Sequence, residues 1–172
     1  MHRAVVALLV ISAACSKSPP RPSGDGDAGK KPDMPSPTQP PASDKRATIH
    51  LEGAKGDVVV AAEVVATPAT IQRGLMYRSH LPPDEGMLFL MGYEDDHVFW
   101  MHNTLIPLDM IFIGKDMKVA GVYANATPRT DDHRSVGAPS LYVLEVNGGW
   151  AAAHGVAAGS AVKWDGVEAA AH

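Results

Sequence analysis

Two acidic residues interrupt apolar segments that have the pattern of strands, and they are the first candidates for chemistry. Asp109 interrupts the run PLDMIFI, and side-chain alternation along a strand puts it on the same face as Ile111. Glu145 interrupts LYVLEV and shares a face with Leu141 and Val143. A carboxylate on an apolar face must reach solvent or find a donor or a cation. Asp109 and Glu145 are therefore predicted to be either paired or functional.

The chain offers three cations as partners for Glu145, namely Arg73, Arg78 and His102. One interpretation is a structural ion pair that fixes a helix to the sheet. The other is an arginine–carboxylate pocket for a small polar ligand. A third hypothesis joins Asp109 and Glu145 in acid–base hydrolysis, which requires both carboxyl groups to face one cleft.

The segment Trp100-Met101-His102-Asn103 could provide an aromatic wall and polar groups beside these acids. Alternation places Trp100 and His102 on one strand face and the other two residues on the opposite face. For Asn103, a turn position is slightly favoured, because Asn-Thr followed by Ile-Pro is good turn chemistry. The predicted ligand-binding residues are Arg73, Arg78, Trp100, Asn103, Asp109 and Glu145.

Methionines are dense in the same region, with six of them between Met76 and Met117. Thioether and imidazole ligands suit Cu(I), so Met101 with His102 is a copper hypothesis. Methionine also fills cores, and this interpretation is favoured because most of these residues lie in apolar patterns. We therefore expect neither a metal nor another cofactor.

Known catalytic motifs are missing from the chain. It has no G-x-S-x-G serine and no phosphate-binding glycine loop in its apolar part. Its one cysteine, Cys15, precedes the apolar part, so thiol catalysis there is excluded. No catalytic residue is predicted, and a non-enzymatic function is favoured.

The N-terminus has the order of a secretory signal peptide. A basic start is followed by the apolar run AVVALLVI, by small residues and by Cys15. Small residues before a cysteine resemble the bacterial lipobox, although Ser12 stands where leucine is usual. Residues 1–14 are thus a predicted signal peptide and Cys15 a predicted lipidation site. An ordinary signal peptide cut near Ala14 is the alternative.

Residues 15–46 have the composition of a disordered tether. Residues 16–46 hold eight of the fourteen prolines, and their only large apolar side chain is Met34. The prediction is a domain at 47–172 attached through Cys15 to a bacterial envelope membrane and exported to the periplasm or cell surface. That domain has 8 Lys/Arg and 15 Asp/Glu, a net charge of −7, which argues against a nucleic-acid partner.

The elements that must position the candidate residues are mostly short strands. Periodicity predicts strands at 48–51, 57–66, 86–91, 98–101, 107–113, 118–124, 141–146 and 160–164. Thr67-Pro68 predicts a helix start, with the helix ending near Ser79, and Trp150–His154 predicts a helical turn closed by Gly155. This pattern indicates a mainly β domain, a single sandwich or barrel with one or two short helices, not a βαβ sheet.

Five blocks in order give the sequence a family resemblance. They are Gly74-Leu75-Met76, Gly86-Met87-Leu88-Phe89, Phe99-Trp100-Met101-His102-Asn103-Thr104, Pro107-Leu108-Asp109 and Val143-Leu144-Glu145-Val146-Asn147-Gly148-Gly149. The series resembles the DUF192 family over nearly all of residues 57–164. The resemblance implies a compact jelly-roll-like β fold, often secreted in bacteria, and implies no mechanism. His102 stands where the family usually has lysine.

The sequence thus predicts a tethered, non-enzymatic β domain that binds a small polar ligand or an envelope protein.

Overall fold

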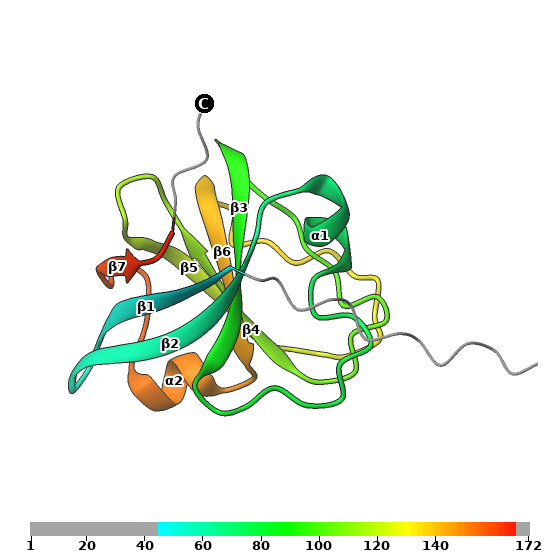
Figure 1. Ribbon diagram of the computed structural model, residues 1–172, viewed down its shortest axis with the longest axis horizontal. Coiled ribbons are helices and arrows are strands. Elements are labelled where there is room, and N and C mark those ends of the chain that lie inside the picture. Colours follow the sequence, from blue (N-terminus) through cyan, green and yellow to red (C-terminus); the bar gives the residue numbers. More distant parts are fainter. Residues whose placement is uncertain (1–44, 168–172) are drawn as a thin grey trace, which may run out of the picture. The chain divides into compact units, whose positions relative to one another are not determined.

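A computed structural model describes residues 45–167, in which seven strands and two short helices form a domain (Figure 1). The predicted signal peptide, Cys15 and nearly all of the predicted tether lie outside these residues. Neither helix in the described part is long and apolar enough to cross a bilayer. The elements are β1 (Arg46–Gly53), β2 (Gly56–Val65), α1 (Pro68–Arg73), β3 (Glu85–Asp95), β4 (Leu108–Ile113), β5 (Val119–Ala126), β6 (Ser140–Asn147), α2 (Trp150–His154) and β7 (Val162–Asp165).

The strands form one sheet in the order β5-β4-β6-β3-β2-β1-β7. The two ends of the sheet meet again: Lys118 pairs with Ala161, and Val119 N donates to Ser160 O at 2.9 Å. The sheet therefore curls toward a closed barrel, which leaves little free strand edge. Only β2 and β3 pair in parallel, through a crossover that contains α1. With one crossover among otherwise antiparallel pairs, the domain is not a βαβ sheet, as the sequence indicated.

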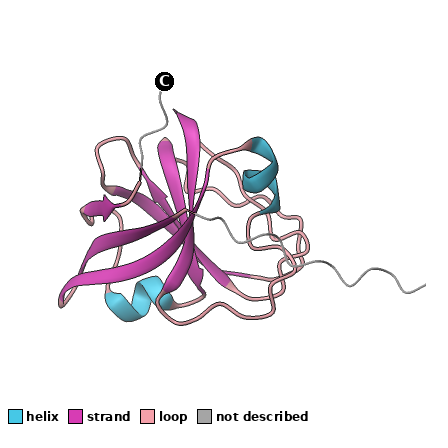
Figure 2. Cartoon of the chain, in the orientation of Figure 1, coloured by secondary structure: helices cyan, strands magenta, loops and turns pink. Residues whose placement is uncertain are grey.

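Strand β4 is buried along its whole length, and β3 and β6 are buried on both faces over residues 86–90 and 143–146, which explains their continuous apolar runs. One face contributes to an inner cluster that receives residues from all seven strands and from α2, including Ile111 and Leu144. The other face contributes to an outer cluster that includes Phe89 and Phe112. The outer cluster is covered by the segment after α1 and by loops, which Figure 2 shows gathered on one side of the sheet.

The mainly β prediction with two short helices is confirmed. Two local predictions were wrong. The helix after Thr67 ends at Arg73 rather than near Ser79, because Gly74 leaves helical geometry at φ 45° and ψ −134°. Residues 98–101 form no strand and make one isolated bridge, between Phe99 and Arg134. This segment is held as a loop over the outer cluster.

Candidate functional site

Glu145 lies in the middle of the outer face of the sheet. On β6 it stands between Met87 of β3 and Met110 of β4, and it is 5% exposed. Among residues 45–167 its carboxyl group makes no hydrogen bond or ion pair. Burial raises the pKa of Glu145 to about 8, since an apolar surrounding penalises the charged form. At neutral pH it is therefore mostly a protonated acid.

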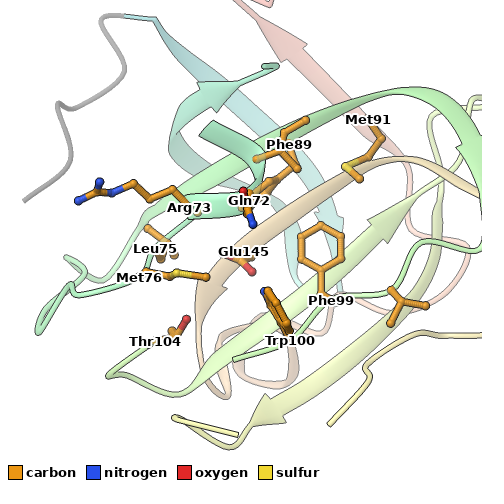
Figure 3. Close-up of a pocket in the computed structure, with 13 residues that line it drawn as sticks. Gln72, Arg73, Leu75, Met76, Phe89, Met91, Phe99, Trp100, Thr104 and Glu145 are labelled. Atoms are coloured by element: carbon orange, nitrogen blue, oxygen red, sulfur yellow. The ribbon is translucent and has the colours of Figure 1, made fainter. Parts of the chain in front are cut away.

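The carboxyl group of Glu145 faces a cavity of about 100 Å³. Figure 3 shows it at the centre of the lining residues, with the Gln72 amide and the Trp100 indole nitrogen turned toward it. Most of the lining is apolar or aromatic. The lining residues are Ile71, Gln72, Arg73, Gly74, Leu75, Met76, Phe89, Met91, Val98, Phe99, Trp100, Thr104 and Glu145. Apolar walls combined with a small number of polar groups are common in cavities that bind small ligands.

Gly74 brings the end of α1 close to this carboxyl group. A Cβ atom at position 74 would lie 3.2 Å from Cζ of Phe89 and 3.8 Å from Oε2 of Glu145. The backbone angles of Gly74 also lie in a region that side chains other than glycine rarely adopt. Thus the Gly74-Leu75-Met76 block of the sequence forms one wall of the cavity.

A loop on the other side of the cavity presents Trp100. The backbone of Met101 anchors this loop through its N–H to Thr130 O at 3.0 Å, and Met101 is fully buried in the outer cluster. Arg134, 2% exposed, donates to the carbonyl of Asp132 and to the hydroxyl of Thr130. Trp100 itself is 45% exposed at the cavity mouth. A buried arginine therefore organises the segment that holds the exposed tryptophan in place.

Asp109 is structural and lies on the opposite face from Glu145. It is fully buried and accepts hydrogen bonds from the N–H groups of Asn125 (2.7 Å), Gly149 (2.9 Å) and Ala151 (2.9 Å). Asp109 pairs in register with Val146, one residue beyond Glu145. Since neighbouring residues of a strand point to opposite faces, the two carboxyl groups cannot share a cleft. The two-carboxylate hydrolase is ruled out.

Arg78 is engaged away from the cavity. Its guanidinium donates to both carboxyl oxygens of Glu63, at 2.6 and 2.7 Å, and Glu63 is 4% exposed. This hydrogen-bonded pair raises the pKa of Arg78 above its ordinary value. The ion pair that the sequence suggested for Glu145 is therefore not formed within residues 45–167, and Arg78 pairs instead with Glu63, an acid that the sequence reasoning did not single out. The same signal, an acid inside the run VVVAAEVV, would have identified Glu63.

Met101, His102 and Asn103 follow Trp100 in the chain, and none of them lines the cavity. His102 is exposed, pairs with Asp131 at 2.8 Å, and its ring centroid lies 5.4 Å from that of Trp100. Asn103 occupies a turn with φ 53°, the position that the sequence slightly favoured, and its side-chain amide donates a hydrogen bond to the hydroxyl of Tyr77. Because Met101 is in the core and His102 faces outward, the structure does not assemble them into a copper site.

Arg73 and Trp100, together with Glu145, are the predicted residues that line the cavity. In Figure 3 the guanidinium of Arg73 points away from Glu145, and it lies 5.9 Å from the Tyr77 ring centroid. Sequence reasoning missed Gln72, Thr104 and Phe99 as lining residues, because a pattern along one strand does not reveal which loops cover it.

Comparisons with known proteins agree with this fold. A crystal structure from Sinorhizobium meliloti 1021, described as a candidate transcription regulator, shares 34% identity and a TM-score of 0.67, covering 71% of this chain and 95% of its own. A protein of unknown function from Novosphingobium aromaticivorans DSM 12444 shares 42% identity and a TM-score of 0.66, covering 68% of this chain and 84% of its own. The comparison with curated proteins gave no match. The model of the DUF192 family, described as an uncharacterized ACR, matches residues 49–164, and the chain therefore belongs to this family.

Proposed function

We propose that the domain binds a small ligand in the cavity over Glu145. The observation that carries this proposal is a buried carboxyl group that faces a cavity and has no partner within residues 45–167. Burying such a group without a partner costs stability, so an apolar residue would serve the fold better. A ligand that bonds to the carboxyl group offsets this cost.

The surroundings of Glu145 support a preformed site. Rigid strands position the acid, while Gly74 and the Met101-anchored loop hold the walls. Trp100 and Val98 remain 45% and 52% exposed at the mouth, where they offer apolar surface to an entering molecule. Such pre-organisation reduces the conformational entropy that the protein loses when a ligand binds.

The proposed setting is the bacterial envelope, with the domain attached to a membrane through a lipid on Cys15. The description of the Sinorhizobium protein suggests a second candidate, contact with DNA. The net charge of −7 over residues 47–172 disfavours that candidate, because binding to phosphates requires a basic surface. A small ligand or an envelope protein remains the better candidate partner.

The proposal is tested by titrating a library of small fragments, varied in charge, into the ¹⁵N-labelled full-length chain. We expect fragments that bind to shift the indole N–H signal of Trp100, while those of Trp150 and Trp164 stay unchanged. The Glu145→Leu variant places an apolar side chain at this buried position, so it should fold but lose these shifts.

Asp165→Asn is the matched control, because Asp165 is an exposed acid on β7 that does not line the cavity. It should bind as the parent chain does. A library that never shifts Trp100, or that shifts it equally in Glu145→Leu, would overturn the proposal.

A further inference from the structure

We infer that the cavity over Glu145 selects a small organic cation, a primary alkylammonium group, which forms an ion pair with the carboxylate between aromatic side chains. This inference rests on the proposed function and specifies the chemical class of its ligand.

The lining combines the two features that stabilise an organic cation out of water. The rings of Phe89 and Phe99 line the cavity with Glu145, and Trp100 turns its indole nitrogen toward the carboxyl group. Phe89 and Phe99 contact each other edge to face at 5.2 Å, which fixes their orientation. The electron-rich faces of aromatic rings attract ammonium groups, and a carboxylate supplies the opposite charge. The thioethers of Met76 and Met91 add polarizable surface for an alkyl chain.

The same lining discriminates against anions. An anion would meet the Glu145 carboxyl group, and the one other charged side chain that lines this cavity in the described residues is Arg73. Figure 3 shows the Arg73 guanidinium directed away from the carboxyl group. The acidic domain, at net charge −7, also attracts cations at long range. The volume of about 100 Å³ suits a ligand of only a few heavy atoms.

Binding is coupled to the protonation of Glu145. Before binding, the carboxyl group holds its proton because burial disfavours the anion. The ammonium group keeps its own hydrogens, and the carboxyl proton passes to the buffer as the ion pair forms. Affinity should therefore rise with pH up to about 8, the pKa of Glu145, and then level off.

Other ionisable groups near Glu145 are already engaged or lie elsewhere. On the elements packed against it, Arg73 of α1 points outward, and Asp109 of β4 faces the opposite side of the sheet. The remaining neighbours lie outside the cavity lining and are paired with each other or with the backbone: Glu63 with Arg78, Glu85 with Arg46, His102 with Asp131, and His97 with Tyr93 O. Proton release on ammonium binding is thus assigned to Glu145.

The experiment compares four ligands of nearly equal size on the full-length chain: n-propylammonium, 1-propanol, propionamide and propionate. The Trp100 indole signal reports binding, and calorimetry in two buffers of different ionisation enthalpy reports proton release. We expect propylammonium to bind tightest, to release close to one proton per ligand at pH 6, and to weaken by at least about tenfold in Glu145→Gln. Asp165→Asn should leave both readouts unchanged.

Three outcomes overturn the inference while leaving the proposed function in place. If propanol or propionamide binds as tightly as propylammonium, or if propylammonium releases no proton, the cavity is a binding site but not a cation site. If none of the four shifts Trp100 while other fragments do, the cation assignment fails alone. If the whole fragment library also fails, the inference and the proposed function fail together.

Discussion

Three buried acids, Glu63, Asp109 and Glu145, interrupt apolar strands, and the structure treats each of them differently. Glu63 pairs with Arg78, and Asp109 binds three backbone N–H groups. Both acids gain partners that offset the cost of burial. Glu145 has no such partner within residues 45–167, so a structural role of the kind that Glu63 and Asp109 have does not explain why an acid occupies this position. The contrast with the other two acids is what makes Glu145 a functional candidate.

The pH dependence of stability tests the state of Glu145. The pKa moves from an ordinary 4.5 to about 8 on folding, so between these values the unfolded chain loses a proton that the folded chain keeps. The stability of the parent chain should therefore fall as pH rises through this window, by about 5 kcal/mol from this residue. Glu145→Gln lacks this titration. In urea unfolding, the free energy of unfolding of the variant should rise relative to that of the parent chain between about pH 5 and 8. Above pH 8 the difference between the two free energies should stay constant.

Asp165→Asn controls for the loss of an acidic group, because it removes an exposed carboxylate. Its stability should follow that of the parent chain at every pH. A constant difference between Glu145→Gln and the parent chain across the whole range would contradict a protonated, buried Glu145.

At the residue scale, the sequence predicted which positions are unusual better than it predicted their partners. Alternation correctly placed Asp109 and Glu145 on apolar faces, because that depends only on the local period of a strand. It could not distinguish Arg78–Glu63 from Arg78–Glu145, since this depends on how β2 and β6 lie relative to the end of α1. The three N–H donors to Asp109 come from residues 16 to 42 positions away in the chain.

At the scale of elements, a six-residue helix positions the site by ending early. Thr67 caps α1 and Pro68 opens its first turn, as the sequence predicted, and the structure adds a capping box between Thr67 and Thr70. Gly74 then turns the chain across Phe89 toward Glu145. The predicted end near Ser79 was wrong because a helix pattern of apolar residues continues through Leu75. The conformation of the glycine ends the helix despite that pattern.

Substituting Gly74 by alanine tests this arrangement. The change should lower the free energy of unfolding by about 1–3 kcal/mol, because φ 45° and ψ −134° strain any side chain. The new Cβ would also press on Phe89 and narrow the space near Oε2 of Glu145, so ligand-induced shifts of Trp100 should weaken. Chemical denaturation and the Trp100 indole signal measure the two effects.

Gly92→Ala is the matched control, since Gly92 also has a positive φ of 81° but a Cβ atom there would have no neighbour within 4 Å. It should cost stability through backbone strain and leave the Trp100 shifts unchanged. Equal effects of both substitutions on ligand shifts would show that Gly74 has no special role in the cavity.

At the scale of the molecule, the curled sheet explains why a site can form on its outside. The inner cluster, closed by α2 and by the contact between Lys118 and Ala161, is the larger core of the domain. The outer cluster is smaller and is covered by loops and by the segment after α1. Loops over a rigid sheet are where binding sites commonly form. Most of the strands were predictable from periodicity. Which face of each strand belongs to the inner or the outer cluster could not be predicted, because that depends on the order of the strands in the sheet.

The remaining prediction is that the whole chain is attached to a membrane, and the chemical state of Cys15 tests it. Produced in a bacterium, the full-length chain should be recovered in the membrane fraction, beginning at Cys15 and carrying a lipid mass. A Cys15→Ser variant should lose the lipid mass and leave that fraction, while its β domain keeps the same Trp100 signal. If the parent chain instead begins at Cys15 with a free thiol, the signal peptide is an ordinary one. With lipid attached, the 30 residues between Cys15 and β1 would, if extended, allow the cavity to reach roughly 90 Å from the membrane, far enough to meet ligands and proteins beyond the lipid surface.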